Sequence, residues 1–588
     1  MPEQSTLDDA APAQAPSDRA DRPARHRSTR AAPPRWSALA PLAAVLVSAL
    51  LAARTLRSSP LADDGALTGP AWAWLDGGPT PALLTPDGLA TVHTAGWALA
   101  TRAFDRHDGL AAAGRELLWT TLVVSCLLLW ALARRAGLGD GAAAIAVLAF
   151  GAVPGLVLLH AVSSPASLAV PWVLLAGLLA TRHRRRGPRT AAALCLAPAV
   201  LLAPDVALLL VAAAAGALSA GRVRPDWSPT VRVVAAGLLA PVFVALVLLL
   251  PGWDPQPPVT TPWAAGETPS VLLTAGLLTA GALAAWLLPR WRPPAAALAV
   301  TTLAAVAPPG RFAALVVCLP VAAVLVSALV QRLVTVPGVH RARPVLLVVG
   351  GATLATAVAL AAVVLPSARA DDFGAADRAE LLDWLGSEVS PQTPVAADGL
   401  LADELDRAGV TVGSGGLEVL RGEPADEAVR EDVVARFGDD DTALVVVDPG
   451  RAEPTADQRA LRRQLAAALL TNPTTAEAGQ ATGALLSGDV DPRLLTLLAG
   501  IAAQYGVGIS SLPAVPGEVG TPVRRVVVDS VAGTPLREDP GLVVLVTTWL
   551  SAQLPPYAPA SVTPLEDGLL ISYGYASDPD GLVVAAGG

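Results

Sequence analysis

Long apolar runs separated by short polar stretches fill the first part of the chain, up to about residue 366. A helix that crosses a bilayer needs about 20 predominantly apolar residues. About eleven runs approach that length, at 37–54, 115–133, 141–159, 165–181, 190–203, 205–220, 232–251, 270–288, 294–308, 311–330 and 344–365. The pattern therefore predicts a polytopic α-helical membrane protein.

The pattern changes beyond Ser367, where shorter apolar segments alternate with polar ones. Helices are predicted over 375–389, 400–409 and 455–472, the last with Thr455 as its N-cap. Strands are predicted over 393–398, 442–450, 524–531 and 568–575. Such alternation is typical of an α/β domain, here expected to contain a mixed sheet. The chain thus divides into a polar tail at 1–36, a membrane domain at 37–366 and an α/β domain at 371–588.

Composition and charge support this division. The chain is 53% hydrophobic, with a mean hydropathy of +0.52, which is high for a soluble protein. Residues 371–588 hold 33 acidic residues against 13 arginines, whereas the preceding part holds 17 against 28. The two parts are therefore expected to lie in different surroundings.

The arginines predict the orientation. They gather in the N-terminal tail and in every second loop, at 134–135, 182–189, 222–224, 290–292 and 332–343. Because cytoplasmic loops are enriched in basic residues, the N-terminus is predicted to be cytoplasmic. An odd number of helices then places the α/β domain and the first loop, 55–114, outside a cell membrane that the chain crosses many times. The tail is expected to be disordered, with its arginines near anionic lipid.

Several kinds of site are excluded or disfavoured. Residues 371–588 contain no His and no Cys, which excludes Ser-His-Asp and Cys-His catalysis there and disfavours a zinc site. The three cysteines lie in apolar runs and predict buried hydrophobic positions. "GDDD" at 438–441 could hold a cation, but a solvated turn is the favoured interpretation. No cofactor is expected to be required. Whether the protein needs a divalent cation is left open by the sequence.

The first external loop carries an acidic pair, Asp63 and Asp64, directly after the first predicted helix. The loop is too long to be a simple connection. Its segment 88–105 has apolar spacing suited to a helix lying along the membrane surface. The pair is either part of a solvated loop or a catalytic group that faces a lipid-borne substrate.

Two stretches resemble the GT-C class of integral-membrane glycosyltransferases, which includes protein O-mannosyltransferases and aminoarabinose transferases, and in particular its actinobacterial members. They are "DDGALTGPAWAW" (63–74) and "AAAGRELLWTTLVVSCLLLWALARRAGLG" (111–139). The chain departs from the family pattern at two places. Ala66 and Leu67 follow Gly65 where the family has a tyrosine, and the His-Pro-Pro element is missing, its nearest match being "TPDGLATVH" with Asp87 and His93.

The resemblance implies transfer of a sugar from a polyprenyl phosphate to an extracytoplasmic acceptor, which could be a cell-envelope glycan, a lipid or a protein. Asp63 matches the catalytic acid position of the family and Asp64 its neighbour, while Asp87 and His93 match substrate-binding positions. An acceptor hydroxyl must lose a proton as it attacks, and a carboxylate can act as the general base. Arg102, Arg115 and Arg311 are candidates to hold the lipid phosphate, or else interfacial arginines whose charged ends reach toward water.

Two other functions stay open. The departures from the family pattern favour a catalytically inactive relative that binds a lipid or a cell-envelope partner as a scaffold. A transporter is the least favoured, because transporters keep ionisable residues within their helices and these apolar runs hold almost none. Nothing in the sequence indicates a nucleic-acid partner.

Overall fold

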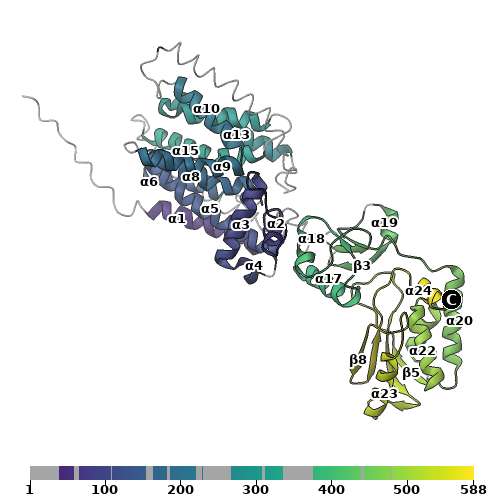
Figure 1. Ribbon diagram of the computed structural model, residues 1–588. Helices are drawn as coiled ribbons and strands as arrows, with labels where there is room; N and C mark the ends of the chain where they lie inside the picture. Colours follow the sequence, from purple (N-terminus) through teal and green to yellow (C-terminus); the bar gives the residue numbers. More distant parts are fainter. Residues whose placement is uncertain are drawn as a thin grey trace, which may run out of the picture.

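The computed structural model describes residues 39–57, 65–107, 109–153, 160, 163–181, 186–219, 228, 267–306, 312–335, 375–424, 426–438, 443–476 and 478–587. A helical part and an α/β part follow one another along the chain, and α17 and α18 of the α/β part lie nearest the helical part (Figure 1). Asp63, Asp64, Arg311, the tail and the predicted runs at 232–251 and 344–365 lie outside the described residues.

The helical part forms a bundle of apolar helices around one core. Its elements are α1 (Leu39–Ala53), η2 (Arg54–Arg57), α2 (Gly65–Leu75), α3 (Pro86–Thr101), α4 (Ala103–Arg106), α5 (Leu110–Arg135), α6 (Asp140–Gly151), α8 (Pro165–Ala180), α9 (Arg186–Leu202), α10 (Asp205–Ser219), α13 (Glu267–Leu287), η5 (Pro289–Trp291), α14 (Arg292–Val306) and α15 (Phe312–Thr335). Small residues let the helices approach closely, as at Gly151, where an added Cβ would lie 2.9 Å from the Ser48 Cβ.

Two helices among the described residues are long and apolar enough to cross a membrane, Leu110–Arg135 and Ala314–Thr335. Other apolar helices of the described bundle, among them α1, α6, α8 and α10, are shorter than a bilayer span. Length and composition alone are weak evidence, since core helices of soluble proteins pass the same test. The arrangement of about eleven membrane helices stays a prediction.

The outer surface of α1 is apolar. Leu39, Leu42, Leu46 and Leu50 are 46–60% exposed, although they follow one another at helical spacing along one stripe. The other side of α1 is buried, with Ala44, Val45 and Leu51 in the core of the bundle. An exposed leucine stripe on a helix that also packs inward is typical of a surface covered by lipid or by a partner.

The arginines of several separate loops meet at one end of the bundle. Arg135, at the end of α5, donates to the Leu178 carbonyl at the end of α8, and Arg290 of η5 donates to the Ala136 carbonyl. The Gly139 amide, just before α6, donates to Gln331 near the end of α15 at 2.8 Å. The α/β part contacts the opposite end of α5, at Leu110. A helix of 26 residues, roughly 39 Å long, separates the two ends.

The α/β part contains two sheets. The first has the order β1-β2-β4-β3, with β1 and β2 parallel and the other pairs antiparallel; the second has the order β5-β6-β9-β8, is antiparallel throughout, and has β7 beside β6. The strands are β1 (Val395–Ala396), β2 (Leu417–Arg421), β3 (Val433–Phe437), β4 (Leu444–Val447), β5 (Val507–Ser511), β6 (Arg525–Val531), β7 (Thr534–Pro535), β8 (Ser561–Leu565) and β9 (Gly568–Ser572). The helices are α17 (Ala375–Glu388), α18 (Gly399–Arg407), α19 (Glu427–Glu431), α20 (Ala456–Thr471), α21 (Ala481–Ser487), α22 (Pro492–Gln504), α23 (Pro540–Ser551) and α24 (Pro579–Gly587).

Local signals placed the predicted elements of this part well. The predicted helix after Thr455 is α20, and Thr455 forms a full capping box with Gln458. A mixed sheet is expected from the sequence, and the first sheet is mixed. In the second sheet all paired strands are antiparallel. The predicted helix at 88–105 is interrupted at Arg102, whose φ of 54° ends α3 and starts α4 in a new direction.

Candidate functional site

The α/β part is seated on the helices of the first external loop. Trp72, Phe104, Leu110 and Ala111 from the loop and the start of α5 share one hydrophobic core with residues of α17, α18 and the first sheet. Trp72 is partly buried against this core. We call this contact the docking interface, defined by α2, α4 and the start of α5 on one side and α17 and α18 on the other.

Two glycines of α2 allow the close approach of α18. A Cβ added at Gly65 would lie 2.8 Å from the Leu400 Cα, and one added at Gly69 would lie 1.8 Å from Asp403 Oδ2. The two helices therefore touch over one full turn, with Gly65 beside Leu400 and Gly69 beside Asp403. Because Gly65 follows Asp63 and Asp64 directly in the sequence, the α/β part packs against the first residue after the acidic pair.

Hydrogen bonds to charged groups fix the rest of the docking interface. Glu404, whose side chain is 3% exposed, accepts from the Leu110 amide at 2.7 Å and from Arg378 at 3.2 Å. Arg407 donates to the carbonyls of Phe104, at 2.6 Å, and His107, at 3.1 Å. Burial raises the pKa of Glu404 above its ordinary value, although Arg378, the Leu110 amide and Arg407 each lower it.

Beside this contact, a second charged cluster ties α4 to α5. Glu116 accepts from Arg106 at 2.9 and 3.0 Å, and its carboxylate lies 2.6 Å from His107 Nε2. Arg106 is about half exposed, so this pair contributes little to stability on its own. Together with Arg407, the cluster holds the short helix α4 in place between the bundle and the α/β part.

The structure does not bring Asp87, His93 and Arg102 together. Asp87 is exposed in the first turn of α3 and Arg102 is exposed just beyond its last turn, so roughly 22 Å of helix separates them. His93 Nδ1 donates to the Leu89 carbonyl at 2.8 Å, and its Nε2 accepts from Trp172 Nε1 at 3.2 Å. His93 Nε2 therefore links α3 to α8, whereas Nδ1 bonds within α3.

Arg115, one of the arginines predicted to hold the lipid phosphate, is buried in the structure. It lies in α5 with a 2% exposed side chain, next to the buried Gly114 and one turn from Leu110 and Ala111 of the docking interface. A guanidinium stays charged even when buried, so it is stabilised by a nearby anion. Arg115 lies in the packed interior at the start of α5, beside the docking interface.

Sequence reasoning missed Glu404, Arg378 and Arg407. A signal for Glu404 exists in the sequence: it stands four residues after Leu400, on the same face of α18 as the buried Leu401 and Leu405. A carboxylate on the apolar face of an amphipathic helix predicts a buried partner for it. The partner itself, the Leu110 amide, lies 294 residues away in the sequence and could not be found from local pattern.

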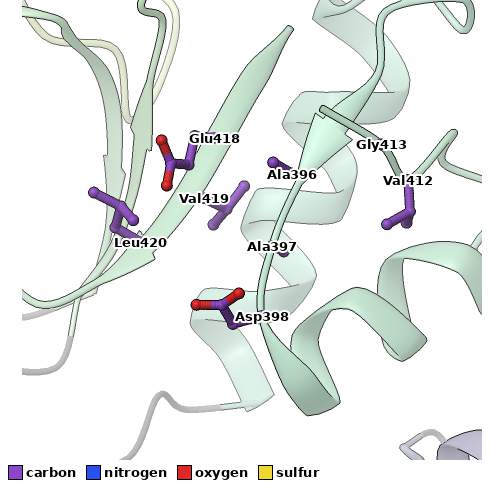
Figure 2. Close-up of a pocket in the computed structure, with 8 residues that line it drawn as sticks. All are labelled: Ala396, Ala397, Asp398, Val412, Gly413, Glu418, Val419 and Leu420. Carbon is purple, nitrogen blue, oxygen red and sulfur yellow. The ribbon is translucent and has the colours of Figure 1, made fainter. Parts of the chain in front are cut away.

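A small hollow of about 170 Å³ opens beside β1 in the first sheet. Figure 2 shows Asp398 at the end of β1 and Glu418 on the neighbouring strand β2, with Val412 and Gly413 on the other side of β1. Two carboxylates without a basic residue in the lining do not suit a lipid phosphate. In the part of the chain that the structure describes, no group of three or more His, Cys, Asp or Glu side chains is placed to hold a metal ion.

No family model, curated protein or solved structure matched this chain in comparisons with known proteins. The resemblance to the GT-C class therefore rests on the two sequence motifs alone.

The close contact at Gly65 gives a first prediction. Gly65→Ala places a Cβ against the Leu400 backbone and is expected to weaken the docking interface by about 1–3 kcal/mol. Gly96→Ala is the matched control, because nothing lies within 4 Å of a Cβ there and alanine favours the helix. Hydrogen exchange of the α18 amides in the full chain is the measurement. Equal exchange in both variants would show that the contact is not tight.

Asp403 makes the docking interface sensitive to pH. Its carboxylate lies against α2, and burial, followed by the charges of Asp406 and Glu404, raises its pKa to about 6 from 3.8. A raised acid pKa means that the folded state holds the proton more tightly. This stabilisation is therefore complete below about pH 4 and is lost as the pH rises through about 6.

Asp403→Asn is accordingly expected to stabilise the protein at pH 7 by about 1 kcal/mol, a value reduced for the partial exposure of the side chain. At pH 4 the variant and the wild type should be equally stable. Thermal unfolding of the full chain at the two pH values tests this. The same stability difference at both values would exclude Asp403 as the titrating group.

Proposed function

We propose that the chain is a membrane glycosyltransferase that moves a sugar from a polyprenyl phosphate to an acceptor outside the cytoplasmic membrane. The observation that carries this proposal is the docking interface on α2, the helix that begins directly after Asp63 and Asp64. An acceptor held by the α/β part would reach the bundle next to the acidic pair. A domain that only tethered the chain to another protein would not need to be seated there.

The arrangement of the bundle supports the membrane part of the proposal. The leucine stripe of α1 suits lipid contact. The arginines of separate loops meet at the end of the bundle away from the α/β part, as expected if that end is cytoplasmic. Both observations favour an α/β part outside the membrane.

Asp63 is proposed as the general base. As the acceptor hydroxyl oxygen attacks the anomeric carbon, its proton passes to the Asp63 carboxylate. The new carbon–oxygen bond forms while the bond from the anomeric carbon to the phosphate oxygen breaks, and the polyprenyl phosphate leaves with that electron pair. Asp64 is proposed to position the acceptor, and Arg115, which is buried in α5, to neutralise the phosphate.

The experiment that tests this function uses the full chain in lipid nanodiscs. Radiolabelled polyprenyl-phosphate sugars are supplied one at a time to the wild type and to Asp63→Asn, and transfer or hydrolysis of each donor is followed. Turnover of one donor by the wild type alone supports the proposal. Absence of turnover for every donor, with any acceptor extract added, contradicts it.

A second candidate is a catalytically inactive scaffold that binds the lipid-linked sugar. The position of His93 favours it, because both ring nitrogens are engaged within the protein, Nδ1 by the Leu89 carbonyl of α3 and Nε2 by Trp172 of α8. In the same assay, a scaffold would retain the labelled lipid on the protein without consuming it.

A further inference from the structure

A small pocket of about 140 Å³ lies at the arginine end of the bundle, between the ends of α5, α13 and α15. Its lining combines buried apolar residues with exposed basic and polar ones. They include Leu288, Ala328, Arg290, Trp291, Gln331 and Arg332. The pocket is thus apolar at its base and basic at its rim, and it lies at the opposite end of α5 from the docking interface.

One wall of the pocket is formed by Arg290. Its guanidinium donates to the Ala136 carbonyl and lies 5.6 Å from the centre of the Trp291 ring. The neighbouring Gly137 has a φ of 89°, and a Cβ added there would lie 3.1 Å from the Arg290 Nη2. Since a guanidinium carries five N–H donors, the bond to Ala136 orients Arg290 and leaves other donors for a ligand.

The facing wall comes from the last turns of α15. Gln331 Oε1 accepts from the Gly139 amide at 2.8 Å, which fixes α15 against the loop between α5 and α6. Arg332 follows Gln331 and lines the same pocket from its exposed rim. Two arginines from distant parts of the sequence therefore border one small cavity whose walls are already held by hydrogen bonds within the protein.

The charge around the pocket is strongly positive. Arg134, Arg135, Arg290, Arg292 and Arg332 gather at this end of the described bundle, and the acidic residue among them, Asp140, pairs with Arg134 at 3.0 Å. Paired guanidinium groups beside an aromatic ring are well suited to phosphate oxygens, because they donate several charge-assisted hydrogen bonds at once. Basic pockets between membrane helices on the cytoplasmic side are typical sites for anionic headgroups.

We propose that this pocket binds a phosphate group, held between Arg290 and Arg332 at the cytoplasmic end of the bundle. The phosphate can belong to the headgroup of an anionic phospholipid or to soluble inorganic phosphate. The apolar base formed by Leu288 and Ala328 suits a headgroup that enters from the bilayer. The site lies at the opposite end of α5 from the docking interface, so it does not depend on the proposed transferase activity.

Native mass spectrometry of the detergent-purified full chain tests the site. Phosphatidylglycerol, phosphatidylcholine and inorganic phosphate are added separately. The test variant is Arg290→Gln with Arg332→Gln, and the control is Arg135→Gln with Arg292→Gln, which makes the same change of charge at the same end but outside the lining. The test variant is expected to retain phosphatidylglycerol about tenfold less than the wild type, while the control retains it nearly as well.

The results distinguish a lipid headgroup from soluble phosphate as the ligand. Loss of phosphatidylglycerol in the test variant alone assigns the site to a lipid, and bound inorganic phosphate that the test variant loses assigns it to the soluble ion. Arg332→Gln alone leaves the bond from Arg290 to Ala136 intact, so it separates loss of the ligand from damage to the fold. Equal loss in the test and control variants, or undiminished retention of both phosphatidylglycerol and inorganic phosphate by the test variant, overturns the proposal.

Discussion

Asp63→Asn is expected to lower the rate of glycosyl transfer by about 10²–10⁴-fold, the contribution typical of a positioned general base. The amide keeps the size of the carboxylate but cannot take up the proton of the acceptor hydroxyl. Binding of the donor should change little, because the polyprenyl phosphate is expected to contact arginine rather than Asp63. Single-turnover kinetics with a saturating radiolabelled donor measure the chemical step directly.

Asp76→Asn is the matched control for this substitution. Asp76 follows the last turn of the same helix, α2, and its side chain is exposed, so its loss should alter the rate by less than about twofold. Similar rate losses in both variants would remove Asp63 from the chemistry.

The division of the chain and many of its elements could be predicted because they depend on local pattern. The helix after Thr455 depends on a capping box within four residues, and the strands β6 and β9 depend on short apolar runs. The interruption of α3 at Arg102 could not be predicted in this way. A left-handed conformation at a non-glycine residue is unfavourable locally and is imposed by the packing of α4 between the bundle and the α/β part.

The docking interface could likewise be predicted from the sequence only in part. The motif that resembles the GT-C class covers 63–74, and α2 within this stretch forms one side of the docking interface. Its bonds, however, join residues separated by about 300 positions, such as Arg407 and Phe104. Such distant pairs cannot be found from local sequence pattern. Gly65 and Gly69, at a spacing of four residues, nevertheless indicate a close helix contact. His93 illustrates the reverse case, since a chemically suggestive residue proves to hold two helices together.

Arg524→Met is expected to cost the α/β part about 3–5 kcal/mol, because it leaves buried carboxylates without their shared cation. Arg524 is 3% exposed and donates to Glu388 at the end of α17, at 2.5 Å, and to Glu518 in the connection between β5 and β6. The side chains of Glu388 and Glu518 are 6% and 5% exposed. Arg524 also donates to the Tyr573 carbonyl beyond β9, so it joins the end of α17 to the second sheet.

Arg525→Met is the control, since Arg525 is more exposed and, among the described residues, its ion pair is with Glu388. We expect it to cost about 1 kcal/mol. Hydrogen exchange of the β6 amides in the full chain measures the loss of local stability, because β6 begins directly after Arg524. If the cost of Arg524→Met comes from uncompensated charge, adding Glu388→Gln and Glu518→Gln should restore part of the protection, because neutral amides need no cation. Continued loss in that triple variant would instead attribute the effect of Arg524 to packing, with the ion pairs themselves contributing little.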